Sequence, residues 1–141
     1  MKIDESVWSL FQQHLGYTDE EMKLFRENPR NEEILAKAAG LMNKTIIAEV
    51  VESHGCNSRH MVGDKFYFDA AGNLLTRLCP EKVCMYALGG LEKLVFGANE
   101  LLYAGLDANK MAFKRTGCPD VGVRCGGFGH IVMELKVEDR P

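Results

Sequence analysis

Apolar residues recur at helical spacing throughout the first 43 residues of the chain. Positions 4–15 follow this spacing and predict a helix, and Gly16 is expected to end it. Thr18 and Glu21 then form the pattern of a capping box, in which the threonine hydroxyl and the glutamate each accept a backbone N–H. A second helix is therefore expected to begin at this point.

The second helix is expected to end at Asn28-Pro29, because the residue before a proline disfavours helical backbone. A third helix is then predicted to open at 31–33 and to close by residue 43. We interpret this helical N-terminal extension, residues 1–43, as packing helices or as contacts for a homo-oligomer or a larger protein partner. Catalytic use of His14 or Tyr17 is the alternative.

The pattern changes to that of strands at residue 44. Four segments are rich in β-branched or aromatic residues or alternate between apolar and polar positions: 45–52, 65–69, 111–115 and 131–137. Helices, two strands, one helix and two strands predict an α+β fold. We expect a small, mainly antiparallel sheet in residues 44–141, with one long helix packed across it.

The long helix is predicted over 80–104. Pro80 suits the first helical position, where its missing N–H has no partner to lose. An apolar stripe follows and includes Cys84. Gly89-Gly90 is expected to divide or kink this helix, or to allow a close packing contact.

Composition excludes several classes of protein. The 141 residues are 46% hydrophobic and 26% charged, which is typical of one globular domain. The net charge of −3 and the scattered basic residues give no reason to expect nucleic-acid binding. No apolar run is long enough for a membrane span, and the N-terminus has no signal-peptide pattern, so a soluble cytoplasmic protein is expected.

Five cysteines are the main functional clue in this sequence: Cys56, Cys79, Cys84, Cys118 and Cys125. An odd number in a chain without a signal peptide favours free thiols, metal ligation or redox chemistry over a disulfide framework. Cys79 would lie at the start of the long helix, where the dipole favours a thiolate, or would only cap it. Cys84, on the apolar stripe, is expected to be a buried core thiol.

The segment from Gly117 to His130 concentrates glycines and reactive side chains. It holds five glycines, two cysteines, Asp120, Arg124 and a histidine in fourteen residues. Its spacing matches neither a phosphate-binding loop nor a zinc knuckle. Asp120 and Arg124 are interpreted either as a pair that shapes the loop or as binding groups.

Three cysteine-containing segments together resemble a family of small uncharacterised bacterial and archaeal proteins. The segments are Cys56 before Gly63-Asp64-Lys65-Phe66, Cys84-Met85-Tyr86-Ala87, and Cys118-Pro119-Asp120 before the last strand. The chain differs from that pattern in its helical extension, in Pro119 and Val121, and in the inserted Cys125-Gly126-Gly127. The resemblance implies that Cys56, Cys84 and Cys118 form a shared trio, and it implies no reaction.

The first hypothesis is therefore a metal centre in which the trio ligates an iron–sulfur cluster or zinc. The fourth ligand would come from four candidates: Cys79, Cys125, His54 and His60. With an open position, the metal would act on a small polar substrate, and Asp120 or a histidine would move protons.

The second hypothesis is a metal-free thiol site. Cys118 or Cys79 would be the nucleophile or redox thiol, and His54 or His130 would be the base. The amides of Gly126 and Gly127, beside Arg124, would hold an anion or a cofactor group. A third hypothesis is an accessory subunit with structural cysteines, so whether the protein is an enzyme stays open.

Overall fold

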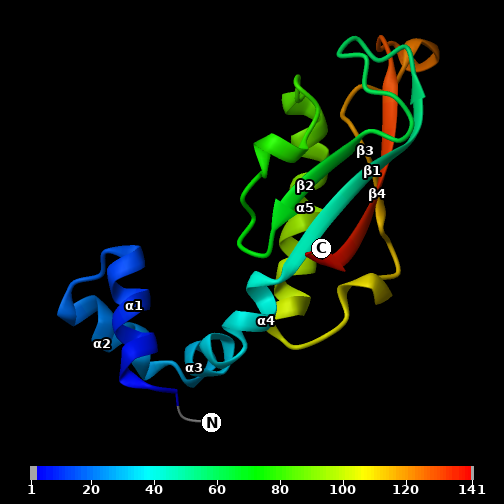
Figure 1. Ribbon diagram of the computed structural model, residues 1–141. Helices are drawn as coiled ribbons and strands as arrows, with labels where there is room; N and C mark the ends of the chain where they lie inside the picture. The colour runs from blue at the N-terminus through cyan, green and yellow to red at the C-terminus, as the bar shows by residue number, and fades with distance from the viewer. Residues whose placement is uncertain (1–2, 141) are drawn as a thin grey trace. The chain divides into compact units, whose positions relative to one another are not determined.

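The computed structural model describes residues 3–140, which divide into two compact units. The first unit extends to Leu41 and is helical, and the second begins at Met42 and contains the sheet (Figure 1). No helix within residues 3–140 is long and apolar enough to cross a membrane.

The first unit confirms two of the predicted helices and their ends. Helix α1 (Glu5–Leu15) ends at Gly16, whose φ of 72° is the left-handed conformation that glycine adopts readily. Helix α2 (Asp19–Glu27) begins with the complete capping box of Thr18 and Glu21. A small core holds these helices together, built from the buried residues Trp8, Met22 and Leu35 and the partly buried rings of Phe11, Tyr17 and Phe25.

The predicted third helix is wrong in its start and in its continuity. Helix α3 (Pro29–Ala36) begins before Asn31, because the Asn28 side chain accepts the Arg30 amide at 3.0 Å and Pro29 occupies the first helical position. Helix α4 (Ala38–Met42) is separate from α3. Asn28 therefore ends one helix and caps the next.

The second unit has the predicted α+β architecture. Its sheet has four antiparallel strands in the order β2-β1-β4-β3: β1 (Lys44–His54), β2 (Lys65–Asp69), β3 (Arg115–Gly117) and β4 (His130–Asp139). Helix α5 (Met85–Tyr103) packs against this sheet (Figure 1).

Cross-strand register places the largest buried side chains of the sheet on the face that the helix covers. Ile46 of β1 pairs with Phe68 and Val137, and the next inward position, Ala48, pairs with Phe66 and Leu135. All of these residues are buried. Helix α5 contributes the matching buried stripe of Ala87, Leu91, Val95, Ala98 and Leu102. Burial of this apolar area is the main stabilising term for the unit.

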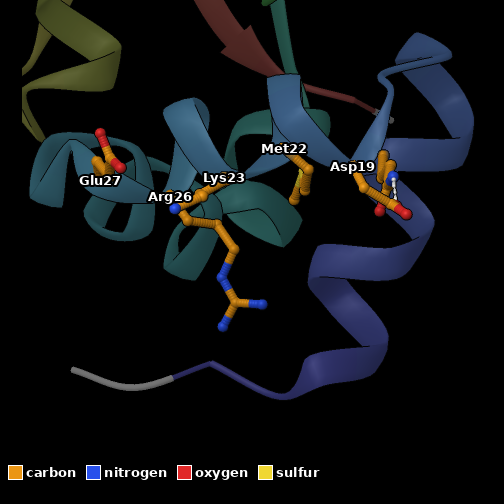
Figure 2. A pocket seen from close by; sticks show the side chains of 6 residues that line it. Asp19, Met22, Lys23, Arg26 and Glu27 are labelled. Atoms are coloured by element: carbon orange, nitrogen blue, oxygen red, sulfur yellow. Dashed lines mark hydrogen bonds between the residues drawn. The ribbon is translucent and has the colours of Figure 1, made fainter.

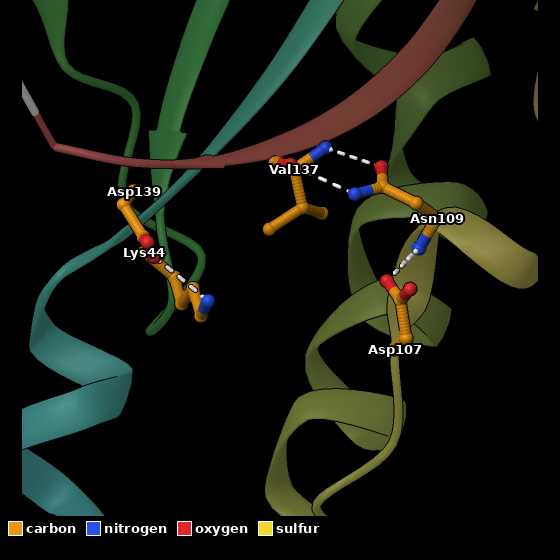
Figure 3. Close-up of polar contacts among 5 residues, drawn as sticks. All are labelled: Lys44, Asp107, Asn109, Val137 and Asp139. Atoms are coloured by element: carbon orange, nitrogen blue, oxygen red, sulfur yellow. Dashed lines mark hydrogen bonds and ion pairs between the residues drawn. The ribbon is translucent and has the colours of Figure 1, made fainter.

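The strand predicted at 111–115 is wrong, because the strand in this region is the short β3. Asn109 takes the place of a strand residue: its side chain donates to the Val137 carbonyl at 2.9 Å and accepts the Val137 amide at 2.8 Å. Asp107 caps the short 3₁₀ turn (Ala108–Lys110) that presents Asn109. Near the same end of β4, Asp139 pairs with Lys44 of β1 at 2.7 Å (Figure 3).

The predicted start of the long helix is also wrong. Cys79 follows a 3₁₀ turn (Thr76–Leu78), and its thiol is held there: Sγ donates to the Leu75 carbonyl at 3.3 Å and accepts the Tyr67 amide at 3.3 Å. Residues 80–84 are irregular, and α5 begins at Met85 with Cys84 as its N-cap. The helix-terminus argument made for Cys79 therefore applies to Cys84.

Gly90 allows α5 to approach β3 closely, which confirms the expected packing contact at Gly89-Gly90. The helix continues unbroken through both glycines. A Cβ on Gly90 would overlap the Gly117 carbonyl, whereas one on Gly89 would meet nothing within 4 Å. Thr116 Oγ1 also donates to the Gly90 carbonyl at 3.0 Å.

Gly90→Ala is expected to destabilise the protein by about 1–3 kcal/mol, because the methyl group forces α5 away from β3. Gly89→Ala, on the same turn, is expected to stabilise it by about 0.5–1 kcal/mol through helix propensity alone. Urea unfolding of both variants measures the difference. Equal stability of the two variants would contradict the close packing at Gly90.

Candidate thiol site

Three segments meet at one end of the sheet domain and bring the predicted cysteine trio into one region. The loop after β1 touches the loop before β4: a Cβ on Gly129 would overlap the Gly55 carbonyl and lie 2.6 Å from the Cys56 amide nitrogen. The Cα of Cys118 would lie 3.6 Å from a Cβ on Gly90 of α5. The segments at this end of the domain are therefore held together by close contacts between backbones, made at glycines that have no side chain.

Cys84 is the cysteine whose surroundings favour the thiolate. It is half-buried at the N-cap of α5, where the helix dipole and free amides favour negative charge. Burial raises the pKa of the Cys84 thiol, but hydrogen bonds from the Ser58 hydroxyl and from the amides of Ala87 and Tyr86 outweigh it, so the net pKa is lowered. A lowered thiol pKa increases the thiolate fraction at neutral pH.

His60 fixes the loop that carries Ser58. Its ring is 3% exposed, and its Nε2 accepts the Cys84 amide at 3.2 Å. Burial lowers the pKa of His60, against the opposing attraction of Asp64, and the charge of Lys82 lowers it further. A neutral ring with Nδ1 protonated is consistent with Nε2 as an acceptor. His60 therefore positions the start of α5 and is not a free base.

Cys118 lies next to His130, as the thiol hypothesis requires. Its Sγ is 3.6 Å from His130 Nδ1 and 3.7 Å from the Asp120 carbonyl oxygen. The same Nδ1 also contacts the Asp120 carbonyl, which has no proton to donate. Nδ1 must therefore carry the proton in that contact, so it is a donor near Cys118 in this conformation.

The Asp120 carboxylate organises the glycine-rich loop. Oδ1 accepts the amides of Gly122 and Phe128 at 3.0 and 2.9 Å, and Oδ2 accepts the amide of Gly129 at 2.9 Å. The amide of Gly129 is the largest cause of the lowered Asp120 pKa. No ion pair joins Asp120 to Arg124 within residues 3–140, so backbone amides shape the loop in place of the expected pair.

The other predicted residues of this loop are engaged in its turns or are exposed. The amide of Gly126 donates to the Val123 carbonyl, and that of Gly127 donates to the Gly122 carbonyl at 2.8 Å. Arg124 and Cys125 are exposed in a 3₁₀ turn (Val123–Cys125). Their predicted binding roles stay predictions.

His54 and Cys56 lie on the β1 side of the same end. His54 is exposed and pairs in register with His130 across β1 and β4. Cys56 is half-buried at the start of the following loop. None of the five cysteines, all within residues 3–140, forms a disulfide.

The side chains of the trio are not gathered as ligands in this conformation. Within residues 3–140, no three His, Cys, Asp or Glu side chains lie close enough together to hold a metal ion. Part of the reason is that Cys118 lies beside Gly90, which is six residues, or roughly 9 Å, along α5 from Cys84.

A hollow of about 300 Å³ separates the start of α5 from the glycine-rich loop. Its lining is mostly apolar and comprises Tyr86, Pro119, Asp120, Val121, Gly127 and Phe128. Tyr86 is two residues from Cys84, and Pro119 follows Cys118 directly. The hollow thus lies between segments that carry two of the cysteines.

A second hollow, of about 500 Å³, lies on the helical unit and has a charged lining (Figure 2). Its Arg26 is already engaged, because its guanidinium pairs with Glu5 at 2.7 Å and stacks over the Trp8 ring. Asp19 accepts a hydrogen bond from Gln12 at 3.0 Å. These contacts engage Arg26 and Asp19 with the unit itself.

Comparison of this chain with protein-family models, with curated proteins and with solved structures finds no match. Any chemical role of the five cysteines must therefore be inferred from the geometry of the chain itself.

Sequence reasoning missed the capping position of Cys84 and its partner Ser58. Cysteine is not among the residues that mark a helix start, so no cap pattern pointed to Cys84. Pro80, in contrast, gave a strong but misleading start pattern. The contact with Ser58 joins residues 26 positions apart, which periodicity cannot detect.

Replacement of Asp120 by Asn is expected to loosen the glycine-rich loop, because an NH₂ group would face the Gly129 amide in place of Oδ2. Hydrogen exchange at Gly122, Phe128 and Gly129 should become faster. In the unmodified protein the same protection should be present above about pH 4 and be lost as pH falls through the lowered pKa of Asp120.

The matched control for this variant is Asp107→Asn, since Asp107 also caps a short turn, through one amide, outside this loop. It should leave exchange in the glycine-rich loop unchanged. Unchanged exchange in Asp120→Asn would contradict the role of Asp120 as the organising residue.

Proposed function

We propose that the protein acts through a reactive thiolate at Cys84, with the hollow beside Tyr86 as the site of a small substrate. The observation that carries this proposal is the position of the half-buried Cys84 at the N-cap of α5, where the free amides of the first turn and the helix dipole favour negative charge. The lowered pKa of its thiol agrees with this position, and the thiolate is the nucleophilic form of cysteine.

The other thiols are less suited to this role. The thiols of Cys79 and Cys118 each donate their proton to a backbone carbonyl, that of Leu75 and that of Asp120, and the protonated Nδ1 of His130 is not a base for Cys118. Cys84 requires no separate base, because its deprotonated form is stabilised directly. The thiolate would attack an electrophilic carbon or sulfur, and the displaced group would leave with the bonding electron pair.

The hollow indicates the kind of substrate. Its lining combines the apolar surfaces of Tyr86, Val121 and Phe128 with the negative carboxylate of Asp120, which already accepts three loop amides. A small, largely apolar electrophile without strong negative charge suits this surface.

Cys84 is expected to be the fastest of the five cysteines to react with iodoacetamide at pH 7. Ser58→Ala should slow this reaction several-fold, because loss of the hydroxyl donor raises the pKa of Cys84 toward its ordinary value. The measurement is the alkylation rate of each cysteine against pH, followed by mass spectrometry of the peptides.

Ser9→Ala, on a helix of the first unit, is the control and should leave the Cys84 profile unchanged. A Cys84 rate no greater than that of exposed Cys125 would overturn the assignment.

A second candidate function is supported by the meeting of the three cysteine segments through close backbone contacts. In this proposal Cys56, Cys84 and Cys118 bind a soft metal, as zinc or an iron–sulfur cluster, after rearrangement of their side chains. Thiolates select such metals over magnesium or calcium. The lowered pKa of Cys84 also suits a ligand, since the thiolate is the binding form.

Protein purified without oxygen should then contain iron with acid-labile sulfide, or stoichiometric zinc. Cys118→Ser is expected to abolish metal retention, and Cys125→Ser should retain it, because Cys125 lies exposed outside the trio. Elemental analysis of both variants is the measurement. Equal metal content in the two would exclude the trio as the ligand set.

A further inference from the structure

A separate hollow of about 370 Å³ lies between α5 and the turn that follows β2. Its lining is largely apolar: Phe68, Ala71, Gly72, Leu74, Leu88, Leu91, Glu92, Val95, Phe96 and Asn99. None of these residues belongs to the candidate thiol site. All lie within the second unit.

Asn99 is a buried polar residue in a lining that is otherwise largely apolar. It stands on the buried stripe of α5, one turn from Val95, and is 7% exposed. Its Oδ1 is buried and has no hydrogen-bond partner within residues 3–140. A buried amide oxygen without a partner lowers the free energy of unfolding by about 1–3 kcal/mol, and an apolar side chain at this position would avoid that loss.

The walls of the hollow are held in place independently of any ligand. The Asp69 carboxylate accepts the amides of Ala71 and Asn73 at 2.9 Å each, which fixes the turn after β2. The Tyr103 hydroxyl donates to the Ala70 carbonyl at 3.0 Å and ties this turn to α5. Gly72 lies next to Asn99, since a Cβ there would be in van der Waals contact with Nδ2 at 3.7 Å. The hollow is therefore preformed, which is typical of small-molecule sites.

We propose that this hollow binds a small apolar molecule that carries one hydroxyl group, and that the hydroxyl pairs with the Asn99 amide. A hydroxyl both donates and accepts, so it can satisfy either orientation of the amide. A carboxylate has no proton to donate and would meet the negative Glu92 of the lining. An ammonium group would lose more hydration on burial than one amide oxygen restores.

The test is a titration of the full-length protein with 2-phenylethanol, followed by amide chemical shifts. Saturable shifts confined to residues 68–74 and 88–99 are expected. Phenylacetate should bind at least tenfold more weakly. Asn99→Leu, which keeps the size of the side chain but removes its polar atoms, should weaken binding of the alcohol by roughly tenfold, a loss of one hydrogen bond.

Asn57→Leu is the matched control, because Asn57 is exposed and lies outside the hollow, and it should bind as the unmodified protein does. If Asn99→Leu fails to fold, Leu88→Trp fills the same hollow without changing Asn99 and should abolish the shifts. Unchanged affinity in Asn99→Leu, shifts located elsewhere, or no saturable binding of the alcohol would each overturn the proposal. The last result, together with unchanged or reduced stability of Asn99→Leu, would assign the amide to a buried water.

Discussion

The close approach of α5 to β3 at Gly90 and Gly117 is the constraint on which the rest of the sheet domain depends. Gly90 has no Cβ, so the helix can approach the Gly117 carbonyl, which such a Cβ would overlap, and Thr116 adds a hydrogen bond to Gly90 at the same point. Because this contact fixes α5 against the sheet edge, it also fixes the start of the helix. The position of Cys84 beside the loop after β1 follows from a contact made six residues further along the helix.

The sequence pattern was most informative where one local interaction determines the structure. The capping box at Thr18 and Glu21, the left-handed Gly16 and the alternation of β4 each depend on residues near one another in the chain, and each prediction is confirmed. The α+β arrangement followed from the order of these elements. Prediction failed where contacts with distant residues override the local pattern. Asn109 bonds to Val137 in the place of the strand expected at 111–115. Cys79 is held in a turn by Tyr67 and Leu75, although Pro80 had indicated a helix start there.

The same distinction applies to the candidate site. The five cysteines and the glycine-rich loop were visible in the sequence, because their residue types are conspicuous. What each residue does was not visible, since it depends on hydrogen bonds between segments. Asp120 was expected to move protons or to pair with Arg124, yet its two oxygens accept three loop amides. Cys84 was expected in the core, yet a shift of the helix start by five residues makes it the N-cap.

These findings change where chemistry is to be sought. The loop from Gly117 to His130 drew attention because of its composition, but its carboxylate, its Gly126 and Gly127 amides and its imidazole Nδ1 are all engaged with the loop's own backbone. A loop whose polar groups bond to its own backbone lines the hollow and gives it its shape. The thiol with a lowered pKa, Cys84, lies outside this loop at the start of α5, two residues before Tyr86, which shares a hollow with the loop. A thiol at the N-cap of α5 has a polar environment that does not depend on the loop. In the function proposed above, the loop would therefore select the substrate and Cys84 would react with it, so the shape of the loop could differ without altering the thiol.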